Sequence, residues 1–457
     1  MENAVTCGYY VAYGNIVDLA RGLTIEKAMK KISLTIALLM IAMLSAIPAE
    51  IIADSTPSDS TPVLKGDGLN DYLNYAEASN PAVKAAFYSW KAKERQISID
   101  HSLPDPQLSY TNMFENGGTF TDFEKEKFGL SQMFPWFGTL GARKDVASGA
   151  AAAAYNKYEA EKLKVFYMVK AAYYSYYLLG REISITQDNF DLLTFWEKVL
   201  RARYAASMAS QPDLIKVQVE LGNLENNLTS LHAKQTVAES SLRAVLNLPD
   251  SVRLPFPDTV ENFEAPIEAS SIRADAFASN PDLQSMQNMI ASAKASINVA
   301  SKESYPSFML GAMYTKQPAM GSIKMYPWEV NVGVSLPIWF GRNKAKREKA
   351  RAMFNSAQES YADSRNQLSA YVDKVVFEYQ DADRRRQLYG TGLIPKAQQA
   401  LDVTYASYQA DNTDFLSLLD AERQLLNFQL AYETSLATQA TKLAEIEMLT
   451  GKEQLTQ

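Results

Sequence analysis

The chain has 457 residues, with 45 Lys and Arg against 52 Asp and Glu, which gives a net charge of −7. This acidic balance predicts no nucleic-acid partner. Two histidines and one cysteine leave almost no material for a metal cluster, a disulfide framework or a thiol catalyst, so we predict no metal site and no cofactor.

Residues 1–53 are typical of an upstream leader followed by a secretory signal peptide. Two lysines precede the apolar run 32–46, and small residues follow it. The run is shorter than the roughly 20 residues of a membrane-spanning helix, although an uncleaved anchor is the alternative. Cleavage after Ala49 or after Ala53 fits equally well. Because the first 28 residues have no place in such a signal, we expect translation to start at Met29 and not at Met1.

The rest of the chain contains one unit twice. Ser79-Asn80-Pro81 recurs 200 residues later, the Trp-Phe-Gly that starts at Trp136 recurs 203 residues later, and Tyr204 matches Tyr408. Such a small drift indicates two copies with small insertions in loops. We set the boundaries as an N-terminal linker over 54–70, a first repeat over 71–248, an inter-repeat linker over 249–266, a second repeat over 267–450 and a tail over 451–457.

Each copy is predicted to form a helix, two strands, a very long helix and a further helix. In the first copy we expect a helix over 71–99, strands near 107–114 and 127–134, and an unbroken helix over 140–205. The second copy has strands near 307–315 and 328–336 and a long helical segment over 342–410. At about 1.5 Å per residue, the helix over 140–205 is a rod of roughly 100 Å.

Apolar residues along these helices repeat at coiled-coil spacing. Leu178, Ile185, Leu192 and Val199 lie seven residues apart, and the next helix alternates steps of three and four over 214–231. A repeat of 3.5 residues keeps one seam facing a partner helix. We therefore predict coiled-coil hairpins that pack side by side.

The strands alternate between apolar and polar residues. In the last strand Val330, Val332 and Val334 interleave with Glu329 and Asn331, so one face favours apolar surroundings and the other favours water. Strands of about nine residues with this pattern are long enough to cross a bilayer when tilted. Two hairpins cannot close a membrane barrel, because unpaired edges are not tolerated in lipid, so several copies must share one barrel.

Aromatic residues gather near the strand ends, where a membrane barrel would meet the two lipid interfaces. The alternative interpretation is that they are ordinary core aromatics. The candidates for the interface are Tyr110, Phe134, Trp136, Phe137, Trp328, Trp339 and Phe340.

This order of features resembles the TolC-type outer-membrane efflux protein family, the outer-membrane factors of tripartite efflux or type I secretion systems. The strand exits Phe-Pro-Trp-Phe-Gly (134–138) and Pro-Ile-Trp-Phe-Gly (337–341) carry the resemblance together with the duplicated plan. The resemblance implies a mostly α-helical homotrimer, whose twelve-stranded barrel in outer-membrane lipid continues into an α-helical coiled-coil tunnel. It also implies a periplasmic adaptor (membrane fusion protein) and an inner-membrane transporter of RND or ABC type as partners.

In this family the helix-to-helix turns at the periplasmic end form a gate. The resemblance places there Asp213, with Tyr408 as its hydrogen-bond partner, and Asp420 as a pore constriction. The family's arginine five residues after the second tyrosine is replaced by Thr413. Asp213 is also a good helix N-cap, and Asp420 is equally compatible with a solvated helix surface.

From these features we predict a passive outer-membrane channel that exports small toxic compounds, metal ions or polypeptides. The alternative is a periplasmic coiled-coil adaptor of the same kind of system. We predict no enzyme, because His101 and His232 lie on different predicted elements and form no acid–base pair. The sequence leaves the exported substrate and the identity of the pump open.

Overall fold

We describe a computed structural model of the chain over residues 64, 66, 68–113, 125–257, 259–260, 267–316 and 327–452. The chain divides into two compact units, Met1–Thr61 and Pro62–Gln457, and all that follows concerns the second. The predicted leader, its cleavage sites, its start at Met29 and most of the linker over 54–70 lie outside the described residues.

The segment predicted as one helix over 71–99 is two helices, α2 (Leu69–Ser79) and α3 (Pro81–His101). Asn80 separates them in an extended conformation, and its side chain accepts hydrogen bonds from the backbone N–H groups of Ala82 (2.8 Å) and Val83 (3.4 Å). A capping Asn followed by Pro in the first turn is a strong helix start. The second copy repeats the break between α6 (Ala269–Ser279) and α7 (Pro281–Lys302).

Two long helical hairpins make up most of the fold. The first consists of α4 (Thr139–Ala205), which has 67 residues, and α5 (Gln211–Leu246). The second consists of α8 (Phe340–Gln387), the π-helical turn η2 (Leu388–Leu393), α9 (Ile394–Gln409) and α10 (Phe415–Thr450). The segment predicted over 342–410 is therefore helical throughout but contains a π-helical turn. Among the described helices, none contains a stretch that is both long and apolar enough to cross a membrane.

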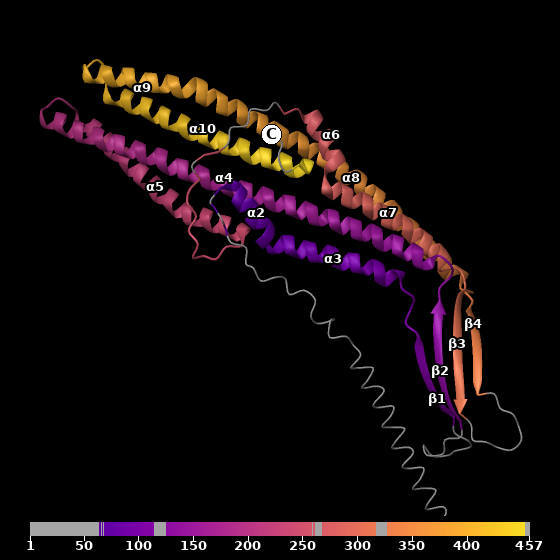
Figure 1. Ribbon diagram of the computed structural model, residues 1–457. Helices are drawn as coiled ribbons and strands as arrows, with labels where there is room; N and C mark the ends of the chain where they lie inside the picture. The colour runs from indigo at the N-terminus through magenta and orange to yellow at the C-terminus, as the bar shows by residue number, and fades with distance from the viewer. Residues whose placement is uncertain are drawn as a thin grey trace, which may run out of the picture. The chain divides into compact units, whose positions relative to one another are not determined.

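The helix α4 lies at the centre of the helical body, where it packs along α3, α5, α7 and α10 (Figure 1). Its buried seam differs from the predicted one. Val199 is 37% exposed, whereas Leu193, Trp196 and Leu200 are buried against the second hairpin. The predicted heptad is therefore displaced by about one residue, because α4 has neighbours on several sides and more than one apolar stripe.

The four strands form one antiparallel sheet at the end of the helical body opposite the hairpin turns (Figure 1). The strands are β1 (Gln107–Met113), β2 (Lys125–Phe134), β3 (Ser307–Lys316) and β4 (Trp328–Ser335), in the order β1-β2-β3-β4. The hairpins of the two copies join where β2 pairs with β3, as in Leu130 opposite Ala312. Within the described chain, the outer edges of β1 and β4 have no strand partner.

Candidate functional site

One face of the sheet is apolar across all four strands. The register places Leu108 beside Leu130, Leu130 beside Ala312 and Ala312 beside Val330. The adjacent row is aromatic and contains Tyr110, Phe128, Tyr314 and Trp328. These side chains are not covered by the helices, since Leu108 is 78% and Val330 76% exposed. A continuous apolar surface of this kind requires lipid or protein against it.

The opposite face of the sheet carries polar and small residues together with methionines. Ser109, Gly129, Met313 and Glu329 form one row across it. A Lys127 Nζ to Glu329 Oε1 ion pair of 3.9 Å also lies on this face. The predicted alternation of strand faces is thus present in three dimensions.

The predicted interface aromatics lie at the ends of this apolar face. Trp136 stacks on Tyr305 (ring centroids 5.1 Å apart) and on Phe308 (5.9 Å), and it is half-buried. Tyr314 contacts Trp328 at 5.2 Å. The other predicted members are exposed, namely Tyr110, Phe134, Phe137, Trp328, Trp339 and Phe340.

At the other end of the helical body the chain forms the same turn twice. Ser207 in the α4–α5 turn and Asp411 in the α9–α10 turn have left-handed φ angles of 59° and 55°. The following helices are capped alike, because Ser210 accepts the backbone N–H of Asp213 (3.4 Å) and Asp414 accepts that of Ser417 (2.9 Å). The duplication therefore extends to the conformation of single residues.

A hollow of about 370 Å³ lies between the two turns, and Arg203 is part of its wall. The Arg203 guanidinium forms an ion pair with Asp411 and lies 4.9 Å from the ring centroid of Tyr408. Burial raises the pKa of the Tyr408 phenol, with a further increase from Asp213, while Arg203 opposes the shift. Arg203 thus ties the end of α4 to the turn of the second hairpin.

Asp213 lines the same hollow as Tyr408, so the structure brings the two predicted gate residues together. The Asp213 carboxylate accepts a hydrogen bond from Ser210 Oγ (2.6 Å), and among the described residues no hydrogen bond joins it to Tyr408. Sequence reasoning missed Arg203 because the family's arginine belongs to the second hairpin. The available signal was a cation directly before Tyr204, in the last turn of a long helix.

Asp420 lies on α10 with its side chain 62% exposed. Its carboxylate is 3.7 Å from the Arg423 guanidinium, which also pairs with Glu220 of α5. Asp420 therefore lies at the surface of the single subunit.

Comparisons with known proteins agree with this architecture. A family model described as outer membrane efflux protein matches residues 72–248 and 272–452. The chain is 23% identical over 351 residues to the toxin and drug export protein A of Aggregatibacter actinomycetemcomitans, covering 70% of this chain and 74% of that protein. It is 21% identical over 390 residues to the cobalt-zinc-cadmium resistance protein CzcC of Cupriavidus metallidurans, covering 84% and 90%. The open state of the Neisseria gonorrhoeae MtrE outer membrane channel shares the fold, with a TM-score of 0.71, 18% identity, and coverage of 84% of this chain and 89% of that one.

Proposed function

Because the chain belongs to the outer membrane efflux protein family, we propose that it is the passive exit duct of a tripartite efflux or secretion system. The protein is a channel component of the outer membrane of a Gram-negative bacterium, and proteins of this family are not enzymes.

The observation that carries the proposal is the incomplete sheet. Its exposed apolar face suits lipid, but the edges at β1 and β4 would leave unpaired N–H and C=O groups there. Three copies, each with four strands, would pair these edges and close a twelve-stranded barrel. In this homotrimer the polar faces of the strands would line the pore.

The helical body would then continue the duct as a tunnel across the periplasm. An adaptor would contact its hairpins, and an inner-membrane transporter of RND or ABC type would supply the cargo. One relative's name refers to toxin and drug export and another's to cobalt, zinc and cadmium. We therefore propose small toxic compounds, metal ions or polypeptides as the cargo range. The adaptor alternative is not favoured, because the family match covers both repeats.

At the end of the helical body that carries the two turns, we assign the gate to the hollow between them, with Asp213, Tyr408 and Arg203 on its walls. Loss of the contacts across this hollow would let the second hairpin move away from the first. Three copies of the exposed Asp420 around one axis would make a constriction that attracts cations.

Native mass spectrometry of protein extracted from outer membranes tests the duct directly. We expect the mass of a trimer. A monomer recovered from the soluble periplasm would contradict the duct and support the adaptor.

Single-channel conductance in planar bilayers tests the gate. We expect Tyr408→Phe to raise the conductance, with Tyr204→Phe as the matched control, since Tyr204 is the equivalent tyrosine outside the hollow. Unchanged conductance in Tyr408→Phe would remove the gate assignment. Asp420→Ala should lower cation preference, and indifference would place Asp420 outside the pore.

A further inference from the structure

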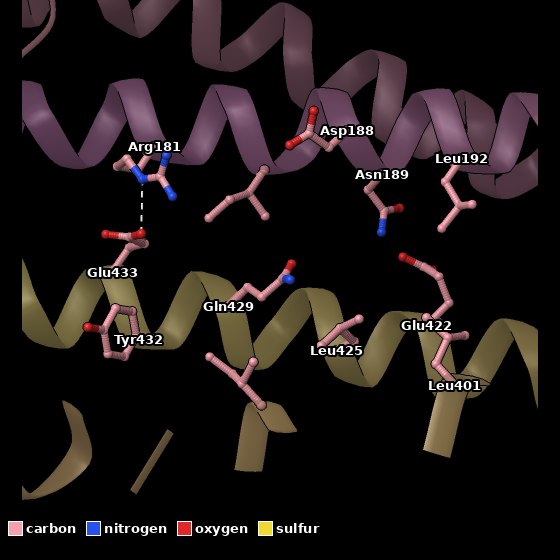
Figure 2. A pocket seen from close by; sticks show the side chains of 12 residues that line it. Arg181, Asp188, Asn189, Leu192, Leu401, Glu422, Leu425, Gln429, Tyr432 and Glu433 are labelled. Atoms are coloured by element: carbon pink, nitrogen blue, oxygen red, sulfur yellow. Dashed lines mark hydrogen bonds and ion pairs between the residues drawn. The ribbon is translucent and has the colours of Figure 1, made fainter. Parts of the chain in front are cut away.

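A second hollow, of about 390 Å³, lies between the two hairpins and is lined in part by polar side chains to which the proposed duct gives no role (Figure 2). Arg181, Asp188 and Asn189 of α4 face Glu422, Gln429 and Glu433 of α10. The apolar part of the wall comes from Leu192, Leu401 and Leu425. We call this site the Glu422 hollow.

Arg181, which brings a positive charge to the lining, already forms an ion pair with Glu433. Arg181 Nε donates to Glu433 Oε1 at 2.9 Å (Figure 2). Tyr177 Oη donates to the other oxygen of the same carboxylate, also at 2.9 Å. These contacts satisfy Glu433. The lining therefore keeps an excess of negative charge, from Asp188 and Glu422.

Glu422 is 1% exposed, and neither of its carboxylate oxygens accepts a hydrogen bond within the described chain. The amide oxygen of Asn189 is likewise buried without a donor. Figure 2 shows the Glu422 side chain pointing from α10 toward α4, close to Asn189. Buried acceptors without a donor are costly, and an unpaired buried carboxylate is especially so. The arrangement calls for a donor between α10 and α4.

The charges around Glu422 favour a donor that is itself positive. Burial and, to a smaller extent, the charge of Glu220 of α5 raise the pKa of Glu422 to about 7, against the opposing effect of the adjacent Arg423. Arg423 is directed to Glu220 and Asp420, so it does not satisfy Glu422. At neutral pH a cation that enters the hollow can therefore shift Glu422 to its ionised carboxylate form.

We propose that the Glu422 hollow binds an organic ammonium ion, whose N–H groups donate to Glu422 and Asn189 and whose hydrocarbon part contacts Leu192, Leu401 and Leu425. A volume of about 390 Å³ falls in the range of small-molecule sites and far exceeds the space that a single coordinated metal ion fills. The ligand would bridge α4 of the first repeat and α10 of the second.

The ionisation of Glu422 gives the proposal a pH dependence with a definite sign. A cation binds the carboxylate and not the carboxylic acid, so affinity rises as the pH increases through the pKa of about 7. Binding at or below that pKa releases a proton. A neutral ligand of the same shape would show the opposite preference or none.

Isothermal titration calorimetry on the purified full chain in detergent tests the site, with phenethylammonium as the probe and 2-phenylethanol as its neutral counterpart. We expect saturable binding of the ammonium, tighter one pH unit above the pKa of Glu422 than one unit below it. Glu422→Gln should weaken binding about tenfold or more, because a charge-assisted hydrogen bond is lost. Glu225→Gln, at an exposed carboxylate of α5 outside the hollow, is the matched control.

Several outcomes would overturn the proposal: no saturable binding above the pKa, equal affinity for 2-phenylethanol, or equal affinity in Glu422→Gln. Displacement of the probe by Mg²⁺ at equal concentration would also overturn it in favour of a metal site. Glu422→Gln keeps the side-chain shape and removes a buried charge, so its fold can be checked by circular dichroism before titration. None of these measurements requires transport, so failure here would leave the duct untouched.

Discussion

The helical body and the four-stranded sheet differ in how they treat their apolar side chains. The body buries its own side chains in clusters such as the one around Leu193 and Trp196, and it pairs the buried Arg243 with Glu239. Among the residues that the structure describes, nothing covers the apolar face of the sheet or pairs with its two edges. The body is therefore stabilised by contacts within one chain, whereas in the proposed duct lipid and other copies would stabilise the sheet.

The largest expected effect lies in the body. Arg243 of α5 is 7% exposed and pairs with the buried Glu239 at 2.8 Å. Arg243→Leu leaves that carboxylate poorly compensated, and we expect a loss of about 3 kcal/mol in the free energy of unfolding. Urea unfolding in detergent, followed by circular dichroism, measures it.

The matched control is Arg253→Leu. Arg253 pairs with the same Glu239 at 3.4 Å but is 85% exposed, so its loss should cost at most about 1 kcal/mol. Similar losses in both variants would show that burial within the chain does not set the stability of the body.

The next effect lies in the sheet. Val332→Arg places a charge in the middle of the exposed apolar face and should cost about 2–4 kcal/mol of insertion free energy in a bilayer. Helix unfolding in detergent should not change. The measurement is the urea dependence of insertion into lipid vesicles.

Asn331→Arg, on the adjacent residue of the opposite face, serves as the control for this change. We expect insertion to remain close to that of the unaltered chain. An equal loss in both variants would mean that the two faces of β4 meet the same surroundings, against the assignment of one face to lipid.

The smallest effect concerns two glycines of α4. A Cβ atom on Gly149 would lie 2.9 Å from the backbone nitrogen of Ser292 in α7, whereas one on Gly141 would meet no atom within 4 Å. Gly149→Ala should therefore cost about 1–3 kcal/mol, and Gly141→Ala should gain about 0.5–1 kcal/mol from reduced backbone entropy. A gain in stability from Gly149→Ala as large as that from Gly141→Ala, in the same urea assay, would argue against close packing between α4 and α7.

Sequence reasoning was most successful where one residue period determines the structure. The period-two pattern around Val330 located the strands and their apolar face. Sequence reasoning failed where neighbouring helices determine which residues are buried, as at Val199. A helix with several partners has several apolar stripes, so one heptad does not define its buried face. The capping role of Asn80 was readable but was interpreted only as a mark of the repeat. The hollow around Arg203 depends on two turns that lie far apart in the chain, so a local pattern could indicate Arg203 but not its partner Asp411.

The π-helical turn at Leu388–Leu393 has a consequence for how the two copies correspond. The second copy has one more residue between Trp339 and Tyr408 than the first copy has between Trp136 and Tyr204. The sequence predicts that such insertions fall in loops. This stretch is helical throughout, and a π turn holds one residue more than an α turn. In a continuous α-helix the extra residue would rotate everything beyond it by about 100°. The wider turn absorbs that rotation, so the angular phase is restored before the chain reaches Tyr408.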